Sequence, residues 1–322
     1  MPKKRPSSAY GTDKPSRKLY GYKYDWREVD DWTGRAERPF FGSAAAPLKD
    51  SGKNKIVLLH KSVEEVAGYF PIHNQTIGDC VSHGFLLGVD VVKCVEIANG
   101  ERELWVAESA TEPNYGAARV EIGGGRLGNG DGCYGSWMAR SVTEFGVVTR
   151  ERHGSHDLRR YDGNKARQWG KRGVGCPTDL EPRMRENPIR TTSLITSYED
   201  ARDAIANGYP VAVCSNQGFQ SKRDSEGFAR PSGSWSHCMV FIAVDDRHRR
   251  PGLLCQNSWG PNWITGPKRH GQPDGSFWAD ADIADKMLRV KPDSYSLSGF
   301  VGYPARELDH RDIWGPAPTQ AV

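Results

Sequence analysis

The feature that most constrains this chain is an almost uniformly apolar stretch between residues 79 and 99. Apolar side chains fall on nearly every face of a helix drawn through it: Phe85, Leu86, Leu87, Val89, Val91, Val92, Cys94, Val95 and Ile97. A helix without a polar face has to be buried. Asp79 is an N-cap candidate, and Asn99-Gly100 is a C-terminal stop. The sequence therefore predicts a buried helix at the centre of the fold, with Cys80 in its first turn.

Length and composition allow a large core around this helix. The chain has 322 residues, of which 37% are hydrophobic and 26% are charged, as is ordinary for a soluble globular protein. No apolar run approaches the ~20 residues that a membrane span needs. The basic N-terminus, residues 1–6, is not followed by the apolar stretch of a secretory signal. We therefore expect a cytoplasmic protein that makes no membrane contact.

The net charge and the cysteines narrow the class of protein further. A net charge of +4 is too small to indicate nucleic-acid binding by itself. The seven cysteines lack the regular spacing of a secreted disulfide scaffold, so most are expected to be buried thiols in a reducing compartment. Cys80, His83, Cys133 and Cys176 lack the paired spacing of a zinc site. No metal and no other cofactor is expected.

The residue composition and the apolar pattern change twice along the chain. The first part is rich in Lys, Arg, Pro, Ser and Gly with scattered aromatic residues, which predicts an extended arm draped over the core. Helical patterns then dominate residues 55–195, apart from an exposed arginine-rich insertion at 150–190, and short apolar strands dominate 196–310. This order predicts an α+β fold in two lobes. The predicted parts are an arm at 1–54, a domain at 55–310 and a tail at 311–322.

Cys80 is the candidate nucleophile because of its place in the predicted helix. Nucleophilic catalysis by cysteine needs the thiolate, and a free thiol is mostly protonated at neutral pH. A helix N-terminus favours the anion by at most ~2 kcal/mol, or about 1.5 pKa units. A larger depression of the pKa needs an adjacent imidazolium. A histidine from elsewhere in the fold must therefore supply it.

Five motifs in one order supply that partner and resemble the papain-like cysteine peptidases. The order is Gln75 and Cys80 within residues 74–85, a glycine loop at 132–136, His237 within 236–240, Asn257-Ser258-Trp259-Gly260, and the strand 274–278. The resemblance covers roughly residues 69–302. It is to a bacterial or phage type of the family, without the usual prodomain and without the disulfide near the nucleophile.

The resemblance implies a fold and a mechanism. The fold is a helical lobe and a β-barrel-like lobe with the active-site cleft between them. Cys80 attacks a peptide carbonyl, and His237 acts as general base and then as general acid. Asn257 orients the imidazole. The Gln75 side chain and the Cys80 backbone N–H form the oxyanion hole.

The resemblance also implies which residues contact a peptide or protein substrate. Gly135 lets the substrate backbone approach the cleft wall, and Trp259 shields the His237–Asn257 pair from water. The other residues that it places against the substrate are Tyr134, Ser136 and Ser236.

The sequence departs from the family pattern at several positions. Gln75 lies five residues before Cys80, one fewer than the family spacing. Ile77 replaces the cysteine that would pair with Cys133, and Val81 replaces the usual tryptophan. Two alternatives therefore stay open: a catalytically weak or inactive structural component of a larger assembly such as a virus particle, binding a protein partner through residues 1–54, or an acyl transferase that uses the same cysteine and histidine.

Overall fold

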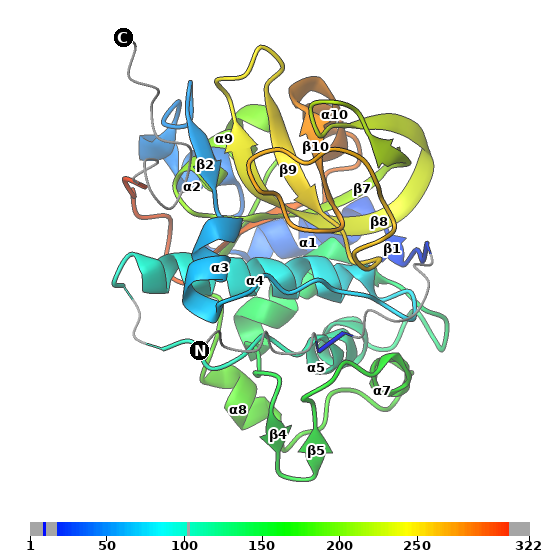
Figure 1. Ribbon diagram of the computed structural model, residues 1–322. Helices are drawn as coiled ribbons and strands as arrows, with labels where there is room; N and C mark the ends of the chain where they lie inside the picture. Colours follow the sequence, from blue (N-terminus) through cyan, green and yellow to red (C-terminus); the bar gives the residue numbers. More distant parts are fainter. Residues whose placement is uncertain (1–8, 11–17, 102–103, 309–322) are drawn as a thin grey trace, which may run out of the picture.

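The computed structural model describes residues 9–10, 18–101 and 104–308. In Figure 1 the chain forms a sheet-rich upper part and a helix-rich lower part, with the long helix α4 between them. The predicted α+β fold with a helical lobe and a sheet lobe is confirmed.

Helices occur along most of the chain and are short except for α4. Their bounds are α1 (Trp26–Arg35), α2 (Phe41–Ala44), α3 (His60–Ala67), α4 (Cys80–Ala98), α5 (Thr111–Ala117), α6 (Gly135–Arg140), α7 (Gly163–Trp169), α8 (Glu181–Arg185), α9 (Tyr198–Ala206) and α10 (Ala281–Arg289). Three single turns add to them: η1 (Ala46–Leu48), η2 (Ala118–Ile122) and η3 (Ser141–Phe145). None of the helices in the described residues is both long and apolar enough to cross a membrane.

The strands concentrate in the second half of the chain. Their bounds are β1 (Tyr22–Lys23), β2 (Ile56–Leu58), β3 (Cys133–Tyr134), β4 (Arg152–His153), β5 (His156–Asp157), β6 (Thr191–Leu194), β7 (Val211–Arg223), β8 (Ala229–Asp245), β9 (Gly252–Gln256), β10 (Ser276–Asp280) and β11 (Tyr295–Ser298).

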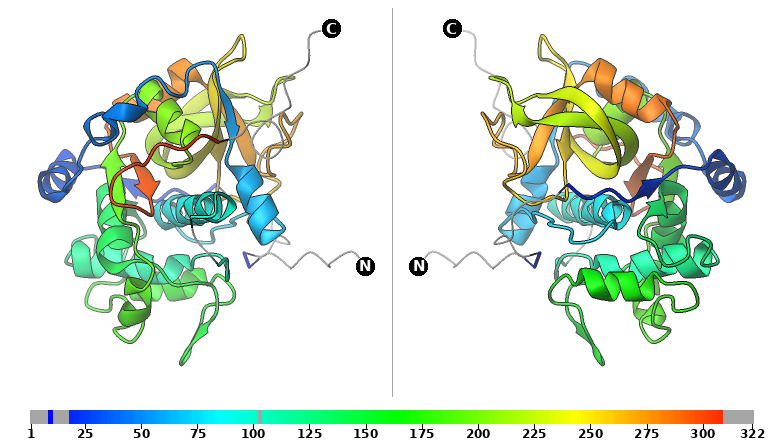
Figure 2. Two further views of the ribbon diagram at one scale, coloured as in Figure 1. Left: turned by 90° about the vertical axis from the view of Figure 1, so that its left-hand side faces the viewer. Right: turned by 90° about the vertical axis from the view of Figure 1, so that its right-hand side faces the viewer.

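Seven of these strands form one antiparallel sheet. Its order is β10-β9-β8-β7-β11-β6, and β2 pairs with β8. The sheet curls in Figure 2, but β10 and β6 at its two ends do not pair, so it is not closed into the expected barrel. Long twisted strands such as β7 and β8 bend a sheet without needing closure.

Helix α4 confirms the strongest prediction from the sequence. Every residue from its start at Cys80 as far as Val92 is buried. Two glycines on one face let it lie directly on the sheet. A Cβ added to Gly84 would come within 2.8 Å of the Cys238 Sγ, and one added to Gly88 within 2.6 Å of a Leu297 methyl group. A larger side chain at either position would cost about 1–3 kcal/mol through overpacking.

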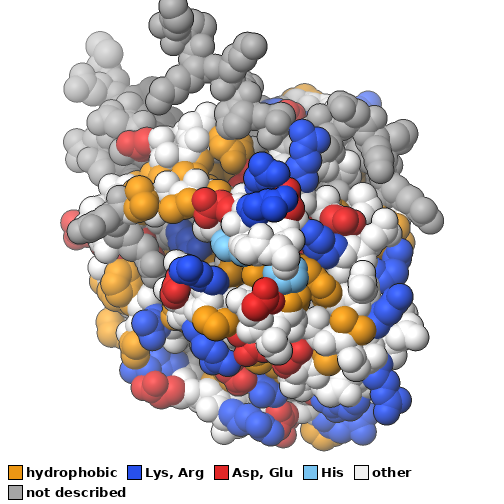
Figure 3. All heavy atoms as spheres, turned by 90° about the horizontal axis from the view of Figure 1, so that it is seen from below, with side chains coloured by type: hydrophobic (Ala, Val, Ile, Leu, Met, Phe, Trp, Pro, Cys, Tyr) orange, Lys and Arg blue, Asp and Glu red, His pale blue; other side chains and the backbone are white. Residues whose placement is uncertain are grey.

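The arginine-rich insertion is more ordered than an exposed loop. It contains the β4–β5 hairpin, α7 and α8, which lie at the bottom of Figure 1. Its apolar residues, among them Leu158, Trp169 and Met184, form a small core together with Ala110, Ala117 and Val148. Seen from below (Figure 3), basic and acidic side chains are interspersed over this face. The charges are locally paired, as in the 2.6 Å contact between Arg159 and Asp157.

The first 54 residues are not extended throughout. Residues 26–35 form α1, whose Val29 and Trp32 are buried against the core and whose N-cap Asp25 accepts a hydrogen bond from the Arg27 N–H. Apolar residues three apart on a polar helix are enough to dock it. Residues 18–24 are irregular apart from β1, and their path matters for the site described next. The predicted tail, 311–322, lies outside the described residues.

Candidate active site

The start of α4 positions Cys80. Its thiol is fully buried, at the end of the helix where backbone N–H groups have no partner within the helix. Asp79 occupies the N-cap position but forms no side-chain cap; its carboxylate instead accepts a 2.9 Å hydrogen bond from the Tyr161 hydroxyl. The Asp79 side chain therefore leaves the first turn of α4 without a side-chain cap.

The sheet brings His237 and Asn257 together. His237 lies on β8, and Asn257 directly follows the neighbouring strand β9. The imidazole Nε2 lies 2.7 Å from the Asn257 Oδ1, which also accepts a 2.6 Å hydrogen bond from the Ser258 N–H. Because Oδ1 only accepts, Nε2 carries the proton and Nδ1 has a free lone pair. Within the described residues Nδ1 has no hydrogen-bond partner.

Aromatic rings cover this histidine–asparagine pair. The Trp259 ring stacks on the His237 ring with the centroids 4.4 Å apart and the planes 30° apart. Trp235 packs against Trp259 at 4.7 Å. Excluding water in this way lowers the local dielectric and strengthens the hydrogen bond that orients the imidazole.

Burial keeps both reacting groups neutral in this structure. Burial lowers the pKa of His237 to about 3, although its hydrogen bond to Asn257 acts in the opposite direction. Burial likewise raises the pKa of Cys80 well above its usual value, and a thiolate at Cys238 would raise it further. Backbone hydrogen bonds from Cys238 and Gly21 to the Cys80 thiol act against this rise. Among the described residues, Cys80 and His237 form no hydrogen bond with each other.

Gln75 is tied to the asparagine segment. The backbone N–H of Gln75 donates to the Ser258 carbonyl at 2.9 Å, and the Ser258 hydroxyl donates to the Gln75 side-chain oxygen at 2.6 Å. The Gln75 side-chain nitrogen donates to the Ile77 carbonyl at 2.7 Å. One N–H of the amide that was expected in the oxyanion hole is thus used within its own loop.

The N-terminal arm runs through the cleft between the lobes. Gly21 donates its N–H to the Ser236 carbonyl at 3.1 Å and accepts the Cys133 N–H at 2.8 Å, so it bridges the two walls. The next two residues, β1, pair in parallel with β3. In the right-hand view of Figure 2, β1 (dark blue) crosses the molecule at about the level of α4.

The arm contacts three of the five residues that were expected to contact substrate. Ser236 accepts the Gly21 N–H, Tyr134 pairs with Lys23, and the Trp259 indole N–H donates to the Leu19 carbonyl at 3.0 Å. The sequence indicated an arm over the core but gave no sign that it fills the cleft.

The other two expected residues lead to a carboxyl group that the sequence did not reveal. The backbone N–H groups of Gly135 and Ser136 donate to Asp293 at 2.8 Å and 2.7 Å. Asp293 is fully buried, and burial raises its pKa to about 8. It belongs to none of the five motifs, so only the folded chain connects it with the cleft.

A second part of the arm is anchored behind the nucleophile. The Tyr10 ring stacks on the His73 ring at 3.9 Å, and the Tyr10 hydroxyl accepts a 3.1 Å hydrogen bond from Arg150. The Ala9 carbonyl accepts the Tyr161 N–H at 3.0 Å. Ala9 and Tyr10 are therefore held by the main domain.

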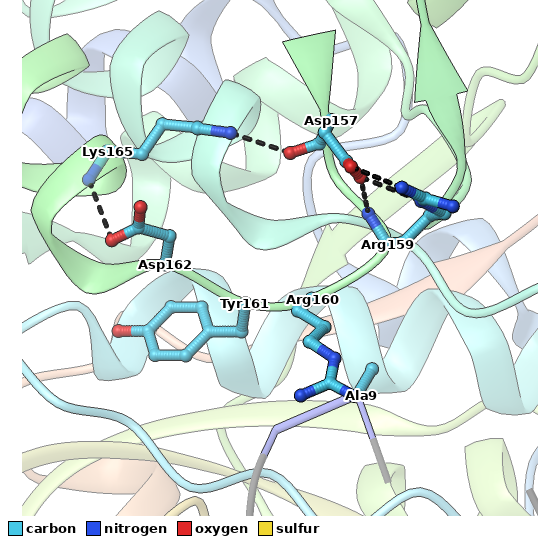
Figure 4. Close-up of a pocket in the computed structure, with 7 residues that line it drawn as sticks. All are labelled: Ala9, Asp157, Arg159, Arg160, Tyr161, Asp162 and Lys165. Atoms are coloured by element: carbon cyan, nitrogen blue, oxygen red, sulfur yellow. Dashed lines mark hydrogen bonds and ion pairs between the residues drawn. The ribbon is translucent and has the colours of Figure 1, made fainter. Parts of the chain in front are cut away.

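One cavity among the described residues lies away from this chemistry. It measures about 650 Å³ and is lined by Ala9 and by residues of the insertion. Figure 4 shows its lining side chains, in which Arg159 turns back to Asp157 and Lys165 donates to the Asp157 carbonyl. Cys80, His237 and Asn257 do not border it. A smaller cavity of about 270 Å³ borders the arm itself, and Gly21, Asn216 and Ser236 are among the residues that line it.

Comparisons with known proteins give weak similarities to cysteine proteases. No family model matches the chain, and no curated protein matches it either. Xylellain, a cysteine protease from Xylella fastidiosa, is 14% identical, with 92% of this chain and 98% of that chain covered and a TM-score of 0.49. Procathepsin B S9 from Trypanosoma congolense is 11% identical, with 89% and 83% covered and a TM-score of 0.46. Procathepsin L2 from Tenebrio molitor larval midgut is 14% identical, with 73% and 66% covered and a TM-score of 0.45. At such values the functional argument depends on the chain's own geometry.

Proposed function

We propose that this chain is a papain-like cysteine peptidase that hydrolyses peptide bonds and that its N-terminal arm holds it closed. Cys80 is the nucleophile, His237 the base and acid, and Asn257 the residue that orients the imidazole. The observation that carries the proposal is the 2.7 Å bond from His237 Nε2 to Asn257, which leaves Nδ1 unprotonated beside the helix that bears the thiol.

The chemistry proceeds once the arm has left the cleft. His237 Nδ1 takes the proton of the Cys80 thiol, and the thiolate sulfur bonds to the carbonyl carbon of the substrate. Free N–H groups at the start of α4 stabilise the oxyanion. The imidazolium then protonates the leaving amine as the C–N bond breaks. A water molecule, deprotonated by His237, hydrolyses the thioester and restores the thiol.

Covalent labelling followed by mass spectrometry tests the nucleophile. A chain whose arm has been loosened, as by the Gly21→Ala substitution discussed below, should react with one equivalent of an epoxysuccinyl thiol reagent at Cys80. Its His237→Ala derivative should react at least about 100-fold more slowly, because no base remains. Cys94→Ala, at the far end of the same helix, is the matched control and should label normally.

A peptide-library assay tests the reaction itself. The loosened chain should cleave peptides, and its Cys80→Ser variant should not. Labelling that is unaffected by His237→Ala, or a loosened chain that labels at Cys80 but cleaves no peptide in a diverse library, would reject the peptidase proposal.

A structural or binding role is the second candidate. It is favoured by the internal use of the Gln75 amide and by the full burial of Cys80 and His237. In that case the arm would be a permanent part of the fold. The loosened chain would then lose stability without gaining any peptide cleavage, and this result separates the two functions.

A further inference from the structure

The Tyr22 side chain fills a pocket in the wall of the cleft. Only 3% of Tyr22 is exposed, whereas Lys23 beside it on β1 faces solvent. Successive side chains of a strand point to opposite faces, so the tyrosine is the one that enters the protein. Near its ring lie the thiols of Cys214 and Cys238, which are directly opposite each other on β7 and β8. The arm therefore fills a side-chain pocket in addition to the part of the cleft in which its backbone forms hydrogen bonds.

The Asp293 carboxyl group lies at the end of this pocket. The two backbone N–H groups that bind it, from Gly135 and Ser136, follow directly after the β3 residues that pair with β1. They hold the carboxyl group in place, close to the Tyr22 hydroxyl. That hydroxyl is completely buried, yet it forms no hydrogen bond of regular geometry with any described residue.

The end of this pocket is best suited to bind a hydroxyl group. Each carboxyl oxygen of Asp293 accepts one backbone N–H, and the hydroxyl groups of Tyr295 and Tyr22 lie close to the remaining acceptor positions. Burial raises the pKa of Asp293 to about 8, so at pH 7 much of it is protonated and also offers an O–H donor. A phenol can serve as donor or acceptor, whereas a phenyl ring leaves the buried polar group unsatisfied.

We propose that Asp293 is a specificity-determining residue and that the pocket now filled by Tyr22 selects a tyrosine side chain of the substrate. This inference rests on the proposed peptidase function and names its substrate class. Tyr22 then occupies the position of the substrate side chain, but without a hydrogen bond of regular geometry. A free peptide, which is not tethered, can place its tyrosine hydroxyl in a better hydrogen-bond geometry toward Asp293.

Peptide binding tests the pocket independently of catalysis. The protein is the full chain carrying Gly21→Ala and Tyr22→Ala, so that its own arm no longer competes. The probes are fluorescein-labelled peptides Leu-Tyr-Gly-X-Lys, with X as Tyr, Phe or Ala, followed by fluorescence anisotropy. The Phe peptide should bind about 3- to 10-fold more weakly than the Tyr peptide, the effect of one net hydrogen bond. The Ala peptide should bind at least about 100-fold more weakly, since a buried ring is lost.

Two further results assign the preference and separate it from the peptidase proposal. Adding Asp293→Ala should bring the Tyr and Phe peptides within twofold of each other. Equal binding of Tyr and Phe peptides to the chain that keeps Asp293 overturns the inference, even if Asp293→Ala does not fold. A tyrosine preference in binding without any peptide cleavage would reject the peptidase proposal alone. Cleavage without a tyrosine preference would reject the inference alone.

Discussion

One added methyl group should open the cleft. Gly21 crosses so close to the loop before Cys80 that a Cβ at this position would lie 1.9 Å from the Gly78 carbonyl oxygen and 2.4 Å from its carbon. Both of these atoms belong to the backbone, so no side chain can rotate away to make room. The backbone conformation of Gly21 is not in the left-handed region, so alanine is opposed by this contact and not by strain in its own φ angle. Gly21→Ala should therefore expel the arm.

The size of the effect follows from the free energy of overpacking. Such clashes typically cost about 1–3 kcal/mol. They act on the closed state only, because the released arm meets no carbonyl group. The population of chains with an open cleft should therefore rise by about 5- to 150-fold. If the arm opens and closes faster than the reagent reacts, the labelling rate of Cys80 rises by the same factor.

A time course of alkylation, resolved by peptide mass spectrometry, measures this rate. Gly34→Ala is the matched control because a Cβ there meets nothing within 4 Å. It makes the same chemical change on α1, and it should leave the Cys80 labelling rate unchanged. A Gly21→Ala chain that melts like the parent chain and labels at the parent rate would refute occlusion by the arm. Equal acceleration by both substitutions would point to general loosening instead.

Three further results are expected. Tyr10→Ala, which removes the ring stacked at 3.9 Å on His73, should lower the free energy of unfolding by about 3–5 kcal/mol in urea titrations and speed labelling of Cys80, whereas Tyr10→Phe should do much less of both. Asn257→Ala should lower the kcat of the loosened chain about 10- to 100-fold in steady-state assays with little change in KM, because the imidazole loses its orienting acceptor. Asp293, with a pKa of about 8 in the fold and about 3.9 unfolded, contributes stability that is complete below pH 4 and is lost as pH rises through 8. Urea titrations at pH 5 to 8.5 should therefore show a free energy of unfolding that falls by at most about 1.36 kcal/mol per pH unit. Asp293→Asn should flatten this pH dependence.

The parts that could be predicted from the sequence are those fixed by local pattern. Helix α4 follows from an apolar run with a turn at each end, and it places Cys80 in its first turn, as the structure does. The strands that bear His237 and precede Asn257 follow from short apolar runs. The side chains of His237 and Asn257 meet because β8 pairs with β9. No local pattern predicts this pairing; only the order of the motifs indicated it.

The parts that could not be predicted depend on contacts between distant segments. The sequence around Gly21 reads as a polar arm, and only the folded cleft shows that a backbone without a side chain is needed there. Asp293 appears in the sequence as an ordinary turn residue before β11. It becomes a buried acceptor because the start of α6 donates two N–H groups to it. Neither feature has a local signature, since Gly78 lies 57 residues from Gly21 and the donors to Asp293 lie more than 150 residues from it.

The arm controls the charge of the site as well as access to it. Water that could solvate an ion pair is excluded while Gly21 and Tyr20 cover the thiol and the imidazole, so burial holds both groups in their neutral forms. The dipole of α4 offers at most about 2 kcal/mol toward a thiolate, which does not offset full desolvation of two charges. Removal of the arm readmits water and makes proton transfer from Cys80 to His237 favourable in the same step. A reagent that reaches Cys80 without displacing the arm would therefore meet a thiol, and its reaction would accelerate with rising pH instead of levelling off near neutrality.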